Sequence, residues 1–132
     1  MYRSSDGLSG FEEGPSLFTP EMRHSALLKR DNRLFVFWTE RNDAPERIWV
    51  AHIDLSTNWQ TWTRSNPVEV LRPEFPWEGA DLPIEPSQGG AINIPVNQLR
   101  DPAIYEEDGR VYLLYSVAGE RGIALAEVHV TP

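Results

Sequence analysis

A segment of eighteen residues occurs twice in this chain without a gap, and the repeat constrains the fold more than any other feature. Residues 22–39 align with residues 99–116, and Arg, Ala, Asp and Arg are identical at four of the aligned positions. Each copy has an Asp-Asn or Asp-Gly pair between two apolar runs, which predicts a β-hairpin. Two unrelated hairpins would not explain the identities. The repeat therefore favours a β-propeller, in which such antiparallel units recur as blades.

The rest of the sequence divides around the two copies. Residues 1–20 are rich in Gly, Ser, Pro and acidic residues, and they predict an irregular lead-in or an arm that exchanges between chains. Residues 21–71 predict a first four-stranded blade, with the fourth strand at 59–64 or 68–71. Residues 98–132 predict a second, incomplete blade of three strands. We expect an all-β fold of antiparallel four-stranded blades, with about two blades in the chain.

A long segment separates the two predicted blades. Residues 72–97 contain five prolines and three glycines, which rule out a continuous central strand. A loop of this length in a compact domain is usually functional or disordered. The aromatic and acidic content of residues 75–81 favours a functional loop.

The charge balance limits the partners. With 20 acidic and 12 basic residues the formal net charge is −8, which disfavours nucleic acid and anionic membrane, because both need a positive surface. The chain has no cysteine for disulfide or thiolate chemistry. It has no apolar run of membrane-spanning length and no apolar signal-peptide core at its start. The compartment stays open: the protein is cytoplasmic, or this is part of a longer, exported chain.

The repeat places His24 and Asp101 at equivalent positions, each preceded by an arginine, Arg23 and Arg100. In a propeller the first strand of each blade lines the central channel. We therefore expect His24 and Asp101 to face one cavity, with Arg100 nearby. Two titratable groups in one pocket can have their pKa values set apart by their environments, as acid–base chemistry requires.

Residues 97–116 resemble the Arg-Asp-Pro blade opening of the five-bladed glycosidases, the arabinanase, xylosidase and invertase-like enzymes of glycoside hydrolase families 43 and 32. Residues 22–27 resemble a late blade of family 43. The resemblance implies that Asp101 binds sugar hydroxyls and tunes the pKa of its neighbours. It also implies that His24 is the channel histidine, which contacts a calcium ion or a water, and that Arg23 and Arg100 help to bind substrate.

Hydrolysis in these families needs two further carboxylates, a general acid and a base or nucleophile. Glu78 and Glu120 are the candidates for the acid, and Trp77 and Asp81 are candidate substrate-binding residues beside Glu78. The base belongs to an earlier blade opening that this chain does not contain. Whether the chain is an enzyme is therefore left open.

Three functions remain compatible with the sequence. The leading one is a glycoside-hydrolase-like fragment or truncated form that binds carbohydrate and hydrolyses a glycosidic bond only when complete. The alternatives are a non-catalytic carbohydrate-binding propeller module assembled from identical chains, and a structural module. Because two-blade units close into rings only with even blade numbers, we expect a homo-oligomer, with a trimer favoured over a dimer.

Overall fold

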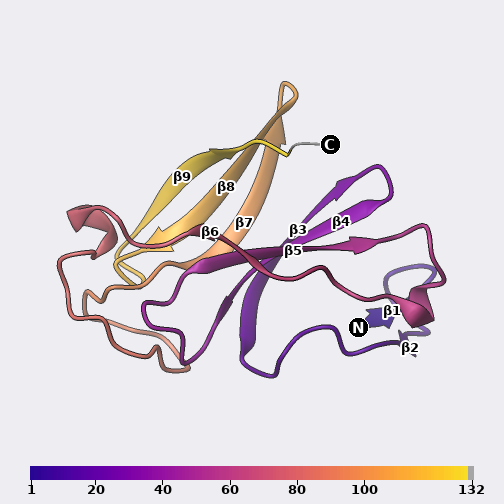
Figure 1. Ribbon diagram of the computed structural model, residues 1–132, viewed down its shortest axis with the longest axis horizontal. Helices are drawn as coiled ribbons and strands as arrows, with labels where there is room; N and C mark the ends of the chain where they lie inside the picture. Colours follow the sequence, from indigo (N-terminus) through magenta and orange to yellow (C-terminus); the bar gives the residue numbers. More distant parts are fainter. Residues whose placement is uncertain (131–132) are drawn as a thin grey trace.

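The computed structural model describes residues 1–130, which form three antiparallel sheets (Figure 1). The N-terminal sheet pairs β1 (Tyr2–Arg3) with β2 (Glu12–Glu13). The next sheet, called sheet I here, consists in spatial order of β3 (Met22–Arg30), β4 (Arg33–Glu40), β5 (Ile48–Asp54) and β6 (Val68–Leu71). Sheet II consists of β7 (Arg100–Glu107), β8 (Arg110–Val117) and β9 (Gly122–Val128).

The helical content is small. Two short 3-10 turns occur, η1 (Trp59–Thr61) and η2 (Pro76–Glu78). No helix among residues 1–130 is both long and apolar enough to cross a membrane. Of the two candidates for the fourth strand of sheet I, residues 68–71 form it as β6, and residues 59–64 contain η1 instead. Residues 72–97 contain η2 and no strand, as their prolines predict.

The all-β antiparallel class is confirmed, whereas the number of propeller blades stays a prediction. Sheet I has four strands and sheet II has three, with β9 at an edge of its sheet. Thr131 and Pro132, which the predicted second unit includes, lie outside the described residues. The repeat is present in the backbone as well. The hairpin turns contain Asp31 and Asp108, which share a left-handed φ of 49°.

The two larger sheets pack on each other, with β3 beside β7 (Figure 1). Their shared core is built from buried apolar side chains of both sheets. Alternate residues of β8 point into it, because side chains on a strand alternate between the two faces. The core contains Leu28, Phe37 and Ile48 from sheet I and Val111, Leu113, Tyr115 and Val117 from sheet II.

The N-terminal segment covers the opposite face of sheet I. Met1, Leu17 and Phe18 pack against a second cluster that includes Val36 and Trp38. The Phe18 and Trp38 rings meet edge to face, with their centroids 5.0 Å apart. The segment predicted as an irregular lead-in or exchanging arm is therefore an arm folded on its own chain. Within residues 1–130 it adds no strand to sheet II.

Candidate functional site

The predicted pair of titratable residues is in contact. Nδ1 of His24 lies 2.7 Å from Oδ1 of Asp101. The two side chains are 42% and 38% exposed, so both reach solvent. Their residues lie near the starts of β3 and β7, which are neighbouring strands of different sheets. The repeat-equivalent positions of the sequence thus converge at one place in space.

A β-bulge presents each member of the pair. The register of β3 against β4 shifts between Arg23 and Ala26, and the register of β7 against β8 shifts between Arg100 and Ala103. An extra residue in one strand re-aims a side chain out of the regular pleat. His24 and Asp101 have left-handed φ values of 47° and 51°, which are uncommon for residues other than glycine.

A serine of β8 holds the carboxylate of the pair. The Ser116 hydroxyl donates to Oδ2 of Asp101 at 2.9 Å. Carboxylate oxygens accept hydrogen bonds, and an imidazole nitrogen accepts or donates one according to its tautomer. The remaining carboxylate lone pairs can therefore meet a ligand that donates hydrogen bonds.

A buried carboxylate links the two arginines next to the pair. Nε of Arg23 donates to Oε1 of Glu46 at 2.9 Å, and the Arg23 Nη2 group donates to Oε2. Nε of Arg100 lies 3.4 Å from the same Oε2. Glu46 is fully buried, and its backbone carbonyl accepts the N–H of Leu99 at 2.9 Å. One side chain of the β4–β5 loop thus supports the starts of both β3 and β7.

All three guanidinium nitrogens of Arg100 are engaged within the protein. Its Nε and Nη2 donate to Oε1 of Gln98 at 3.0 and 2.6 Å. Its Nη1 donates to Oε1 of Glu120 at 2.9 Å and to the Gly90 carbonyl at 3.2 Å. The side chain is buried. That Arg23 and Arg100 help to bind substrate stays a prediction.

The other predicted site residues make contacts of their own. Oε2 of the buried Glu78 accepts the backbone N–H groups of Glu74 and Phe75, at 2.8 and 3.1 Å. Its Oε1 accepts the Tyr115 hydroxyl at 3.0 Å. Glu120 pairs with Arg100, as described above. Trp77 is exposed and stacks on Phe75, with ring centroids 5.6 Å apart, and Asp81 is exposed. In the described part of the chain, none of these side chains hydrogen-bonds to His24 or Asp101.

Sequence reasoning missed Glu46. Residues 43–47 predict a turn with an internal ion pair, and Arg47 does pair with Asp43 at 3.0 Å. Glu46 is not part of this ion pair, and its side chain is buried. The two arginines at repeat-equivalent positions could have indicated a carboxylate between them, because buried arginines require carboxylate partners.

Metal binding has little support at this site. Residues 1–130 contain no group of three or more His, Cys, Asp or Glu side chains placed to hold an ion. The pair alone supplies one nitrogen and one carboxylate, whereas calcium takes six to eight oxygen ligands. The calcium ion that the resemblance implies therefore does not fit the described residues.

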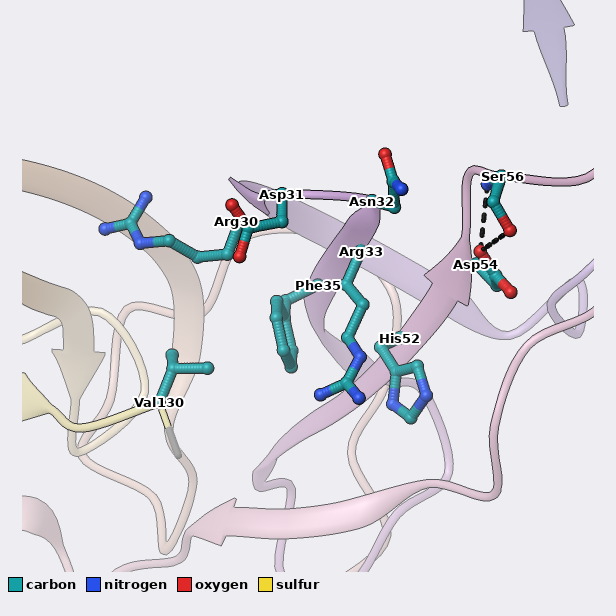
Figure 2. A pocket seen from close by; sticks show the side chains of 9 residues that line it. All are labelled: Arg30, Asp31, Asn32, Arg33, Phe35, His52, Asp54, Ser56 and Val130. Carbon is teal, nitrogen blue, oxygen red and sulfur yellow. Dashed lines mark hydrogen bonds between the residues drawn. The ribbon is translucent and has the colours of Figure 1, made fainter. Parts of the chain in front are cut away.

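A cleft of about 660 Å³ opens away from the pair, at the other end of β3. Figure 2 shows that it lies between the β3–β4 turn, β5 and Val130, which follows β9. Arg33 and His52 lie together at its centre in this view. Asp54 at its edge is held by the Ser56 hydroxyl and backbone N–H, at 2.6 and 2.9 Å. The sequence predicts a site role for none of these residues.

Comparison with known proteins gives one informative match. No family model and no solved structure matches the chain. The chain is 39% identical over 144 residues to an uncharacterized protein, R118, of Acanthamoeba polyphaga mimivirus. The alignment includes 97% of this chain and 40% of the mimivirus protein. The chain thus spans about two fifths of the length of this relative.

Proposed function

We propose that the chain is a carbohydrate-binding part of a glycoside-hydrolase-like protein, and that the His24–Asp101 pair contacts sugar hydroxyls. The observation that carries the proposal is the pair itself, an imidazole and a carboxylate in contact and open to solvent. Sugar hydroxyls both donate and accept hydrogen bonds. A carboxylate accepts them, and an imidazole nitrogen accepts or donates them according to its tautomer. The resemblance to the glycosidase blade opening assigns the same role to Asp101.

The proposal is limited to binding, because hydrolysis needs a second carboxylate at the pair. Glu78 is occupied by two backbone N–H groups and a tyrosine hydroxyl, and Glu120 pairs with Arg100. A complete protein could supply the missing group from residues outside this chain. For the isolated chain we expect no turnover of aryl arabinosides, xylosides or galactosides.

Calorimetric titration with arabino-, xylo- and galacto-oligosaccharides tests the binding site. Asp101→Asn keeps the size of the side chain and removes its charge. Because hydrogen bonds to a charged group contribute about 1.5–3 kcal/mol, we expect the affinity to fall at least roughly tenfold. Asp108→Asn is the matched control, since Asp108 is an exposed aspartate with nearly the same φ as Asp101. Equal affinity of the two variants, or no binding of any oligosaccharide at millimolar concentration, would contradict the proposal.

A further inference from the structure

One arginine has no partner in the described part of the chain, and it lies in a large cleft. Within residues 1–130 every arginine except Arg3 and Arg33 donates a hydrogen bond from its side chain. Arg3 lies over the rings of Trp59 and Trp62. Arg33 makes no hydrogen bond, ion pair or ring contact with these residues, and it lines the cleft of about 660 Å³ at the β3–β4 turn (Figure 2). We call this cleft the Arg33 cleft.

The nearest acidic residue in the sheet register does not pair with Arg33. Arg33 and Asp54 lie directly opposite each other on β4 and β5, and opposite charges at such positions attract each other. The Asp54 carboxylate instead accepts the Ser56 hydroxyl and backbone N–H, at 2.6 and 2.9 Å. Figure 2 shows the Arg33 guanidinium beside His52, away from Asp54. The donors of this guanidinium therefore remain available to a ligand.

His52 provides a second donor beside the guanidinium. It lies directly opposite Phe35, and the centroids of the two rings are 5.9 Å apart. His52 is half-buried, and its ring nitrogens make no hydrogen bond to residues 1–130. A guanidinium donates two parallel hydrogen bonds to a carboxylate, and an imidazole donates one from its protonated nitrogen. Two such groups side by side, with no acceptor of the described chain between them, indicate a site for an anion.

One side of the Arg33 cleft is apolar. Phe35 and Val130 line it, and an adjoining hollow of about 410 Å³ shares both of them and His52 with the cleft. The one carboxylate in this hollow, Glu69, pairs with two arginines. Most of the other lining side chains are apolar and come from both sheets: Phe37, Val50, Val68, Val70 and Val128. A ligand held at Arg33 would place the rest of its body on this apolar surface.

The other charges at the cleft select among anions. Asp31 and Asp54 also line it, and the Arg30 guanidinium pairs with Glu106 at 2.6 Å. The two aspartates repel a dianion such as phosphate more than a monoanion, because the Coulomb energy grows with the charge. A single carboxylate on an apolar body therefore matches both the charges and the apolar surface.

We propose that the Arg33 cleft binds a small organic carboxylate whose apolar body packs against Phe35 and the adjoining valines. The carboxylate of this ligand accepts hydrogen bonds from the Arg33 guanidinium and from the His52 ring. The cleft lies at the opposite end of β3 from the His24–Asp101 pair. The site is therefore separate from the proposed sugar site and does not depend on it.

Titration with three probes at constant pH and ionic strength tests the site. Hydrocinnamate has the carboxylate and the apolar body, hydrocinnamamide has the body without the charge, and inorganic phosphate has the charge without the body. Nuclear magnetic resonance signals of the His52 ring report binding in the cleft, and their loss in His52→Gln identifies them. We expect hydrocinnamate to shift these signals saturably, with an affinity roughly tenfold or more above that of either other probe.

Two variants with the same change of charge locate the carboxylate. Arg33→Gln removes the guanidinium from the cleft, and it should lower the affinity for hydrocinnamate roughly tenfold or more, because hydrogen bonds between charged groups are the stronger ones. Arg121→Gln removes an exposed arginine from the β8–β9 turn, at the other end of β9 from Val130. This control should bind hydrocinnamate like the unsubstituted chain. Both arginines are exposed, so we expect both variants to fold.

Four results would overturn the proposal. Equal affinity for hydrocinnamate and hydrocinnamamide would show that the charge is not recognised, and this comparison requires no variant. Phosphate that binds as tightly as hydrocinnamate would show that the apolar body is not recognised. Equal affinities of the Arg33→Gln and Arg121→Gln variants would place the carboxylate elsewhere. Absence of a saturable shift of the His52 signals at millimolar hydrocinnamate would exclude the site.

Discussion

Glu78 and Tyr115 meet in a buried contact between the long loop and sheet II. The Tyr115 hydroxyl donates to Oε1 of Glu78 at 3.0 Å. Burial, with the hydrogen bond to Glu78 as the next cause, raises the pKa of Tyr115 to about 12. The carboxylate that the sequence suggests as a general acid thus anchors residues 74–78 to β8. The hydrogen bonds of its carboxylate are to groups of this chain, and its role as a general acid stays a prediction.

Tyr115→Phe tests this contact at the residue scale. The substitution removes the donor and leaves a buried carboxylate oxygen without a partner, so we expect a loss of about 1–3 kcal/mol in the free energy of unfolding. Urea denaturation at pH 7 measures it. Tyr105→Phe is the control, because the Tyr105 hydroxyl bonds an exposed glutamate. Equal losses in the two variants would contradict a special role for the buried contact.

The same variant should change how the free energy of unfolding depends on pH under alkaline conditions. An unfolded tyrosine ionises near pH 10, below the pKa of about 12 that Tyr115 has in the fold. The unfolded chain therefore loses this proton first, and the free energy of unfolding falls as the pH rises from about 10 to 12. In Tyr115→Phe this part of the decline should be absent.

At the scale of elements, the hairpins could be predicted and the bulges could not. Asp31-Asn32 and Asp108-Gly109 are local turn signals, since such residues tolerate a left-handed φ. The bulges at His24 and Asp101 are register shifts of β3 against β4 and of β7 against β8, and the pattern of apolar residues does not indicate them. Pro102 gave one hint, because a proline has no N–H for the strand ladder and is tolerated at a bulge.

The bulge geometry makes a prediction for Asp101→Val. A β-branched side chain is strained at the φ of 51° that residue 101 adopts. We expect a loss of about 1–3 kcal/mol in the free energy of unfolding, as for other strained backbone positions. Asp101→Asn should stay close to the unsubstituted chain, because asparagine tolerates this region. Thermal melts of both variants compare the costs, and a valine variant as stable as the asparagine variant would contradict the bulge.

At the scale of the whole molecule, Glu46 ties the two repeat units together. It lies in the first unit and contacts an arginine of each. The units themselves could be predicted from the repeat, because an aligned pattern of apolar residues reports local strands. The contacts between them could not, since Glu46 and the long loop contact residues that lie far away in the sequence.

Glu46→Gln should therefore weaken the entire fold. Removing one partner of a buried ion pair leaves an uncompensated charge, which costs about 3–5 kcal/mol. Urea denaturation followed by tryptophan fluorescence and by far-ultraviolet circular dichroism should show one shared transition at lower urea. Arg30→Gln breaks the exposed Arg30–Glu106 pair between the same two sheets and should cost less than about 1 kcal/mol. Similar costs for the two variants would show that Glu46 is not special.

The sharing of Glu46 has a consequence for how such a chain can evolve. A duplicated unit normally brings its own supporting residues, so each copy can drift independently. Here Arg100 of the second unit pairs with Glu120 of its own unit and also contacts Glu46 of the first. A substitution of Arg23 affects one unit, whereas a substitution of Glu46 affects both at once. In a library of random variants we expect position 46 to accept fewer substitutions than either arginine. A new unit made by copying residues 98–130 alone would arrive without this carboxylate.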